Sequence, residues 1–222
     1  DYPYTTKGDV HGKAINKGFM GDSAEHQHQM NYDKLTRADY AYTPFVPEAE
    51  KDIKVPAWLN DPKYYHNRGD TTFRGENSRH GDFVGLDDLM TEHPTVVNGF
   101  IDIFKGWISK YKIDGFRIDT ARHVNPEFWQ AFVPAMIDHA KLEGIPNFFI
   151  FGEVYEHSPA ELAIFTKRDQ FPAVLDFSIQ SAAERLLLKK ENPEFLMKLF
   201  EADLLYKNGF DTAKTLPTFI SN

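Results

Sequence analysis

The sequence predicts an α/β fold, in which parallel strands alternate with covering helices. Short apolar runs at 113–119, 147–153, 173–177 and 216–221 have the composition of strands, and stretches with a helical apolar period separate them. The run 147–153 is apolar almost throughout, which is typical of a parallel strand buried on both faces. A repeated strand–helix alternation of this kind indicates a parallel sheet with helices packed against it.

The predicted helices carry recognisable start and stop signals. Pro94 suits the first turn of a helix that reaches Tyr111 and has one apolar stripe. Asn125 and Pro126 cap and open the helix after the first strand, and Gly144 ends it. The remaining predicted helices are a short one opened by the capping box that starts at Ser158, then 178–190 and 193–206.

Residues 1–85 lack this alternation, and we predict for them an inserted, loop-rich domain with short strands, followed by the α/β domain over 86–222. His26 and His28 could bind a metal, although two histidines so placed are more often surface residues. A group of aromatic residues could form a small core or a carbohydrate-stacking wall, and the core is favoured. This group is Tyr40, Tyr42, Phe45, Trp58, Tyr64 and Tyr65.

Composition excludes several classes of function. With 33 acidic against 25 basic residues the net charge is −8, so we expect no nucleic-acid partner. No apolar run is long enough to cross a membrane, and without cysteine there is no disulfide or thiolate metal site. The start, Asp1-Tyr2-Pro3-Tyr4, has neither an initiator methionine nor a signal peptide, so we expect a piece of a longer or processed protein. We expect a secreted or periplasmic location, while the oligomeric state stays open.

The stretch Gly115–Val124 carries the first candidate for chemistry. Side chains alternate along a strand, so Arg117 and Asp119 share one face of the predicted strand, and Phe116 and Ile118 share the other. A buried Arg and Asp are costly unless they are paired. The pair is either a structural ion pair or a carboxylate kept ionised by a fixed cation and ready to act as a nucleophile.

A second carboxylate, Glu153, ends the next predicted strand. The carboxyl ends of neighbouring parallel strands lie at one edge, about 4.8 Å apart, so Asp119 and Glu153 could approach each other. A retaining glycosidase needs two carboxyl groups about 5–5.5 Å apart, one as nucleophile and one as acid. Two unrelated carboxylates on loop ends are the alternative.

Four stretches, which follow one another along the chain in the order found in the family, resemble the motifs of glycoside hydrolase family 13, the α-amylase family. Gly115–His123 is similar to the motif on the fourth barrel strand of the family, and Phe151–Val154 to the motif on the fifth. Phe219–Asn222 resembles the start of the Phe-x-x-Asn-His-Asp motif on the seventh, and Gly85–Leu89 the short motif that closes the inserted B domain. The resemblance implies a partial (β/α)8 TIM barrel, strands four to seven, preceded by the B domain.

The resemblance also assigns roles to residues. Asp119 would be the nucleophile, Glu153 the acid/base, and Arg117 the support of the nucleophile. Arg122 and His123 stand where the family usually has Lys-His, near the subsites on the leaving-group side. Arginine keeps the charge but changes the hydrogen-bond geometry. Asn222 would be the substrate-binding asparagine of the last motif.

A calcium site is implied as well. Asp88 matches a ligand position of many family members, with the backbone carbonyls of Arg79 and His123 as partners. Carboxylate and carbonyl oxygens suit calcium. The asparagine that completes this site in the family would precede Asp1.

The function implied is the hydrolysis of α-1,4-glucans such as starch with retention. The third catalytic carboxylate of the family would follow Asn222, so the chain alone is expected to be inactive. One alternative is a cyclodextrin-type or other α-glucan transglycosylase, which Thr72-Phe73 and Glu76-Asn77 weakly suggest. Another is a non-catalytic carbohydrate-binding module, although such a module needs neither Asp119 nor Glu153.

Overall fold

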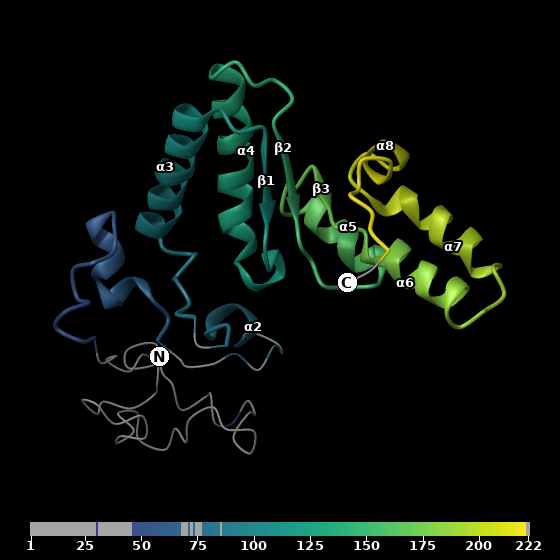
Figure 1. The fold of residues 1–222 in the computed structure, drawn as a ribbon, viewed down its shortest axis with the longest axis horizontal. Helices are drawn as coiled ribbons and strands as arrows, with labels where there is room; N and C mark the ends of the chain where they lie inside the picture. Colours follow the sequence, from purple (N-terminus) through teal and green to yellow (C-terminus); the bar gives the residue numbers. More distant parts are fainter. Residues whose placement is uncertain are drawn as a thin grey trace. The chain divides into compact units, whose positions relative to one another are not determined.

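The computed structural model describes residue 30 and residues 46–67, 71, 73, 77–84 and 86–220. The chain forms two compact units, Asp1–Val96 and Val97–Asn222, which we treat separately (Figure 1). Several residues singled out from the sequence lie outside the described residues. They are His26, His28, Tyr40, Tyr42, Phe45, Thr72, Glu76 and Asn222.

The first unit is built of short turns of helix joined by loops. Its described elements are η1 (Ala57–Asn60), η2 (Pro62–Tyr64) and α2 (Asn77–His80). In place of the short strands predicted here, the described residues form isolated antiparallel bridges, Tyr65 to Leu89 and Phe83 to Leu86.

The aromatic residues described in the first unit pack against their neighbours. The ring of Tyr64 meets Trp58 edge-on, with centroids 5.9 Å apart, and meets His93 at 5.1 Å. Tyr65 is 7% exposed, and its hydroxyl donates a hydrogen bond to the Leu59 carbonyl at 2.5 Å. These contacts favour a core role over a carbohydrate-stacking wall for these three aromatics.

The second unit contains a parallel sheet in the order β1 (Gly115–Ile118), β2 (Phe149–Gly152), β3 (Ala173–Val174). Gly115 pairs with Phe149, and Ile118 pairs with Gly152, so β1 and β2 end at the same level. The Glu153 amide continues the ladder by donating to the Ile118 carbonyl at 2.7 Å. The predicted α/β alternation is therefore confirmed in this unit.

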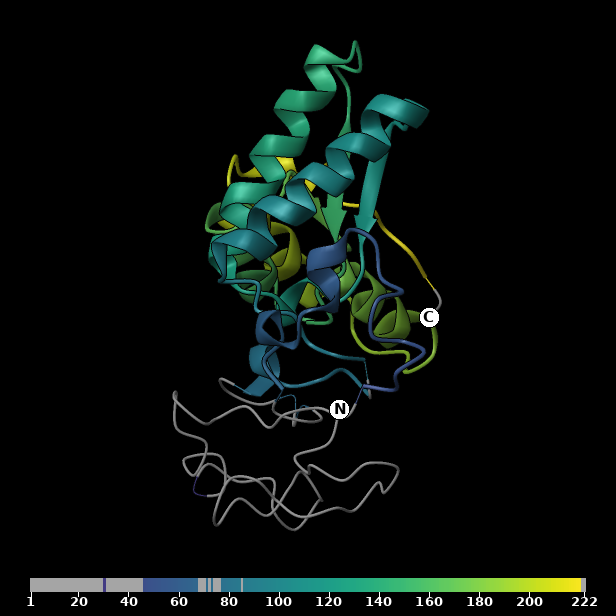
Figure 2. The ribbon, with the colours of Figure 1, turned by 90° about the vertical axis from the view of Figure 1, so that its left-hand side faces the viewer.

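Two long helices, α3 (Pro94–Tyr111) and α4 (Pro126–Leu142), run beside β1 and β2 on one side (Figures 1 and 2). The α4 residues Phe128, Trp129, Phe132 and Met136 are buried. Phe116 of β1 meets Phe104 of α3 edge-on, with ring centroids 5.3 Å apart. Phe116 and Ile150 thus face the helices, and the residues that alternate with them face the other side of the sheet.

Shorter helices follow the sheet strands. They are η3 (Ala121–His123), α5 (Pro159–Lys167), α6 (Phe177–Leu187), α7 (Phe195–Glu201), η4 (Ala202–Leu205) and α8 (Phe210–Ala213). Ser158 is the N-cap of α5, but its side chain makes no capping hydrogen bond, so the predicted capping box does not form. None of the helices in the described part of the chain has the length and hydropathy of a membrane-spanning segment.

Three predicted elements differ from the structure. The strand predicted at 173–177 ends at Val174 because Asp176 caps α6, its carboxylate accepting a hydrogen bond from the Ile179 amide. The helix predicted at 193–206 divides into α7 and η4. Residues 216–220 form no strand, and the Pro217 carbonyl accepts one hydrogen bond from the Asp176 amide. Because Pro217 lacks an amide hydrogen, it cannot extend a ladder in the other direction.

Candidate active site at the ends of two parallel strands

Asp119 lies in a turn that directly follows β1 and is tied down on both sides. The Ala121 amide donates to the Glu153 carbonyl at 2.9 Å, which fixes the turn to the end of β2. The Trp129 indole N–H of α4 donates to the Ala121 carbonyl, also at 2.9 Å. Thr120, which lies between Asp119 and Ala121, has a left-handed backbone conformation, with φ of 47°. A buried helix residue and the neighbouring strand together hold the position of Asp119.

Glu153 follows β2 in the same way, and Gly152 before it makes the close packing possible. A Cβ atom on Gly152 would lie 3.1 Å from the Ala121 Cβ and 3.2 Å from the Phe171 ring. Both distances are shorter than ordinary van der Waals contact, so a side chain at this position would require Ala121 or Phe171 to shift. Glycine at this position therefore lets the turn carrying Asp119 lie close to β2.

Arg117 bridges the two carboxylates. Its Nη1 lies 3.3 Å from Asp119 Oδ1, and its Nη2 lies 3.1 Å from Glu153 Oε2. The contact with Asp119 was predicted from the alternation along β1, and the contact with Glu153 was not. One positive charge thus balances the negative charges of two carboxylates at the strand ends. The planar, forked guanidinium of arginine is well suited to contact both at once.

The two carboxylates have different surroundings. The Asp119 side chain is 70% exposed and that of Glu153 is 23% exposed. The hydrogen bond with Asp119 and burial raise the pKa of Glu153, whereas the Arg117 charge opposes this shift. A carboxyl group with a raised pKa is suited to donate a proton near neutral pH.

Arg122 and His123, predicted near the leaving-group side, belong to η3 directly after the Asp119 turn. The Arg122 Nη1 donates to the backbone carbonyl of Tyr155 at 2.6 Å. Arg122 therefore links the loop after β1 to the loop after Glu153. The sequence does not predict this link, because the arginine bonds to a backbone carbonyl, which every residue has, and not to a particular side chain.

The predicted calcium ligands are divided between the units. Arg79 belongs to α2 and Asp88 to the loop after it, both in the first unit, whereas His123 is in the second. Asp88 Oδ2 lies 2.6 Å from His66 Nδ1. Asp88 is a partly buried carboxylate, and carboxylate oxygen is a ligand that calcium prefers.

Sequence spacing also gives no sign of a side-chain cluster around His66, which is 2% exposed. Its Nε2 lies 2.9 Å from Glu92 Oε1. Burial lowers the pKa of His66, but the hydrogen bonds with Asp88 and Glu92 outweigh burial and raise it to about 9. The His80 ring lies against His66, with centroids 4.6 Å apart. His66, His80 and Glu92 lie far apart along the chain and belong to no common helix or strand, so the sequence does not predict that they meet.

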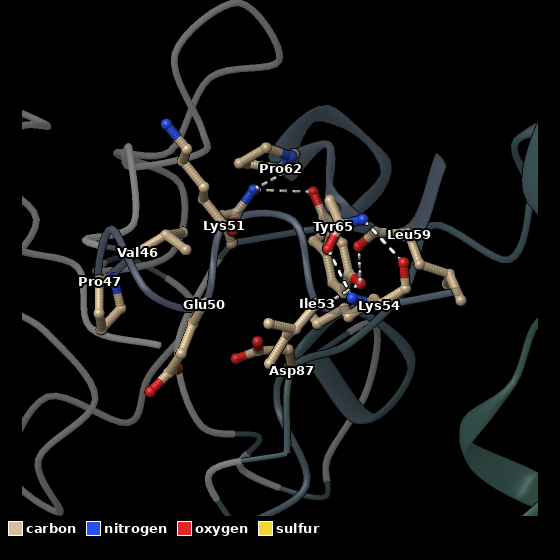
Figure 3. A pocket seen from close by; sticks show the side chains of 12 residues that line it. Val46, Pro47, Glu50, Lys51, Ile53, Lys54, Leu59, Pro62, Tyr65 and Asp87 are labelled. Carbon is tan, nitrogen blue, oxygen red and sulfur yellow. Dashed lines mark hydrogen bonds between the residues drawn. The ribbon is translucent and has the colours of Figure 1, made fainter. Parts of the chain in front are cut away.

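A pocket in the first unit is a weaker candidate (Figure 3). Lys54 Nζ donates to the Tyr65 hydroxyl at 3.0 Å, and the side-chain Nδ2 of Asn60 donates to the Lys54 carbonyl at 2.8 Å. These groups lining the pocket are already engaged within the unit, so we assign the pocket no role in binding.

Residues 19–220 match the model of the family described as alpha amylase, catalytic domain. This match covers most of the chain. The chain belongs to the alpha-amylase catalytic-domain family. Over 221 residues it is 38% identical to an alpha-amylase of Streptomyces lividans, covering 100% of this chain and 23% of that protein. It therefore spans about a quarter of that relative.

Solved structures of alpha-amylase family members have the same fold. The alpha-amylase of Geobacillus thermoleovorans, complexed with acarbose, is 28% identical with a TM-score of 0.62, covering 74% of this chain and 36% of that one. The cyclomaltodextrin glucanotransferase CldA is 25% identical with a TM-score of 0.62, covering 73% and 32%. The parallel strands and helices of the second unit are accordingly part of a (β/α)8 barrel, as the sequence predicts.

Proposed function

We propose that the complete protein is a retaining α-glycoside hydrolase of the α-amylase type that acts on α-1,4-glucans. The observation that carries this proposal is the bridge from Arg117 to both Asp119 and Glu153 at the ends of two adjacent parallel strands. Strands in this register are about 4.8 Å apart. Retaining glycosidases hold their two carboxyl groups about 5–5.5 Å apart.

The roles of the two carboxylates follow from their surroundings. Asp119, the more exposed, attacks the anomeric carbon as the bond to the leaving oxygen breaks, giving a covalent glycosyl ester. Glu153, whose pKa is raised, donates its proton to the leaving oxygen. Glu153 then takes a proton from water, and the water oxygen displaces Asp119 from the same carbon. Two inversions give net retention.

Arg117 acts as a positioning residue in this scheme. The Arg117 guanidinium holds the Asp119 carboxylate in one orientation through its contact at 3.3 Å. Arg122 orders the loop beyond Glu153, and with His123 it is proposed to line the leaving-group side. Asn222, at the end of the matched motif, completes the set of proposed substrate-binding residues.

Stereochemistry tests this proposal. The complete protein should convert linear maltodextrin into linear products whose new reducing ends are α-anomers when first observed by proton NMR. A first product with the β-anomeric configuration would indicate inversion and overturn the double displacement. Absence of any hydrolysis, with carbohydrate binding retained, would favour the non-catalytic module instead.

A cyclodextrin-type transferase or hydrolase is the second candidate. The chain is 32% identical over 103 residues to a protein named cyclomaltodextrinase from Geobacillus thermopakistaniensis, and 73% of the chain resembles CldA in fold. Chromatography of the products from linear maltodextrin separates the candidates. Linear oligomers support the α-amylase type, whereas rings or longer transfer products support the transferase.

We also propose that the complete protein is secreted or periplasmic and binds calcium through Asp88 and the carbonyls of Arg79 and His123. The proposed substrate is a polymer too large to enter a cell, which supports the location, and the carboxylate oxygens of Asp88 support calcium binding. The calcium would supply positive charge and coordination to the oxygen ligands. Immunodetection in culture medium, periplasm and cytoplasm tests the location, and protein confined to the cytoplasm would contradict it.

A further inference from the structure

The first unit contains a cluster of side chains of the types that bind metals, and the proposed catalytic function does not use it. His66 follows η2, His80 is the last residue of α2, and Glu92 lies in the turn before α3. Within the described residues, one potential ligand atom from each of these three lies within 4.8 Å of the other two. Three segments far apart along the chain thus bring two imidazoles and one carboxylate to one point.

Asp88 orients the central histidine. His66 Nδ1 lies 2.6 Å from Asp88 Oδ2, and the His66 amide donates to the Asp88 carbonyl at 2.9 Å. Histidines that bind metals almost always donate their second ring N–H to a carboxylate or carbonyl, which fixes the tautomer and the ring plane. With Nδ1 held by Asp88, Nε2 is the ring nitrogen of His66 that is left to bind an ion, and it lies 2.9 Å from Glu92 Oε1.

The distances leave room for a small ion after a slight adjustment. His66 Nε2 and Glu92 Oε1 are 2.9 Å apart, a hydrogen-bond distance. Two ligands about 2.0–2.1 Å from a tetrahedral zinc ion are about 3.4 Å from each other. Glu92 is 44% exposed, so its carboxylate can move outward by this amount, and solvent can supply a fourth ligand.

The donor set selects the type of metal. Imidazole nitrogen suits zinc and its neighbours among the transition metals, whereas calcium and magnesium prefer oxygen ligands. His66, His80 and Glu92 offer two nitrogens and one carboxylate oxygen, so this ligand set favours a different metal from the all-oxygen set proposed for calcium at Asp88. Without metal, His66 is a protonated histidine flanked by the carboxylates of Asp88 and Glu92, which is the competing explanation for the cluster.

We propose that His66, His80 and Glu92 form a binding site for zinc or a similar divalent transition metal, with Asp88 as a positioning residue. The ion ties together the segment after η2, the end of α2 and the turn before α3. Because it binds the folded unit, it stabilises that unit.

Cobalt titration of the complete protein tests the site. After removal of bound metals, Co²⁺ should produce visible absorption bands of low-symmetry coordination at one ion per chain, and Zn²⁺ should bleach them. A hundredfold excess of Ca²⁺ should leave the bands in place. Displacement of cobalt by calcium, or no bands at any concentration, would overturn the proposal.

Variants identify the ligands. His80→Gln and Glu92→Gln alter partly exposed side chains, so folding is expected to persist, and circular dichroism checks it. Each should weaken zinc binding measured by calorimetry by at least about 10-fold. His139→Gln changes a histidine of the second unit that bonds to Ser109, and should leave zinc binding unchanged. Equal zinc affinity in all four proteins, wild type included, would refute the assignment.

Discussion

At the residue scale, Arg117 decides how charge is distributed between the two candidate catalytic carboxylates. Its contacts of 3.3 Å to Asp119 and 3.1 Å to Glu153 place one positive charge between them. The hydrogen bond with Asp119 and burial raise the pKa of Glu153, and Arg117 is the group that opposes this rise. The protonation range of the proposed acid therefore depends on this arginine.

Replacing Arg117 by glutamine should move the pH profile of the complete enzyme. Without the cation the pKa of Glu153 rises further, so Glu153 stays protonated to higher pH. The alkaline limb of kcat/KM, which reports loss of the proton from the acid, should then shift to higher pH. The maximum rate should fall by about 100-fold, since an oriented charge is lost from the site.

Arg117→Lys is the matched control. Lysine keeps the charge but loses the forked contact, so the alkaline limb should stay near its original pH while the rate still falls. An alkaline limb that moves to lower pH in Arg117→Gln would show that Arg117 does not act on Glu153 as described.

At the scale of elements, the pairing of β1 with β2 sets the distance between the two carboxylates. Gly115 begins β1 opposite Phe149, and a Cβ atom on it would lie 2.1 Å from the Phe149 carbonyl oxygen. That neighbour is backbone and cannot rotate away. Glycine at this point is a condition for the strands to pair in this register.

Gly115→Ala should therefore lower stability by about 3 kcal/mol and reduce activity as well, because the strand ends shift. Gly106→Ala in α3 is the control, since a Cβ atom there would meet nothing within 4 Å. Alanine inside a helix should stabilise by about 1 kcal/mol. Denaturant unfolding of both variants checks this. If Gly115→Ala were as stable as the unchanged protein, the described register would be wrong.

At the scale of the whole molecule, the local sequence predicts much of the second unit. The period of apolar residues places α3 at Pro94–Tyr111, and the apolar runs place β1 and β2 within two residues at each end. Local sequence patterns predict the wrong element where contacts with residues elsewhere in the chain determine the secondary structure. Asp176 ends a predicted strand by capping α6, and residues 216–220 have strand composition without a ladder.

The same difference holds for the sites. Asp119 and Glu153 were predictable because each ends an apolar strand, and parallel strands bring such ends together. The contact between Arg117 and Glu153 and the cluster around His66 depend on long-range packing. No local spacing encodes that His66, His80 and Glu92 meet, so a search for closely spaced histidines considers His26 and His28 instead.

Calcium removal is a test at this scale. If the complete protein binds the ion through Asp88, chelation should lower the melting temperature. The loss is about 2.7 kcal/mol when free calcium is a hundred times the Kd. Restoring Ca²⁺ should restore the melting temperature, and Asp88→Asn should abolish the response. An unchanged melting temperature after chelation would remove calcium from the proposal.

The assignment of nucleophile and acid is most directly tested by trapping the glycosyl-enzyme with an activated α-glucosyl fluoride. Fluoride leaves with little protonation, so the Glu153→Gln variant of the complete protein should still form the ester. Mass spectrometry should then find one glucosyl group on the peptide containing Asp119. The Asp119→Asn variant should remain unlabelled. Labelling of Asp119→Asn together with failure to label Glu153→Gln would reverse the two roles.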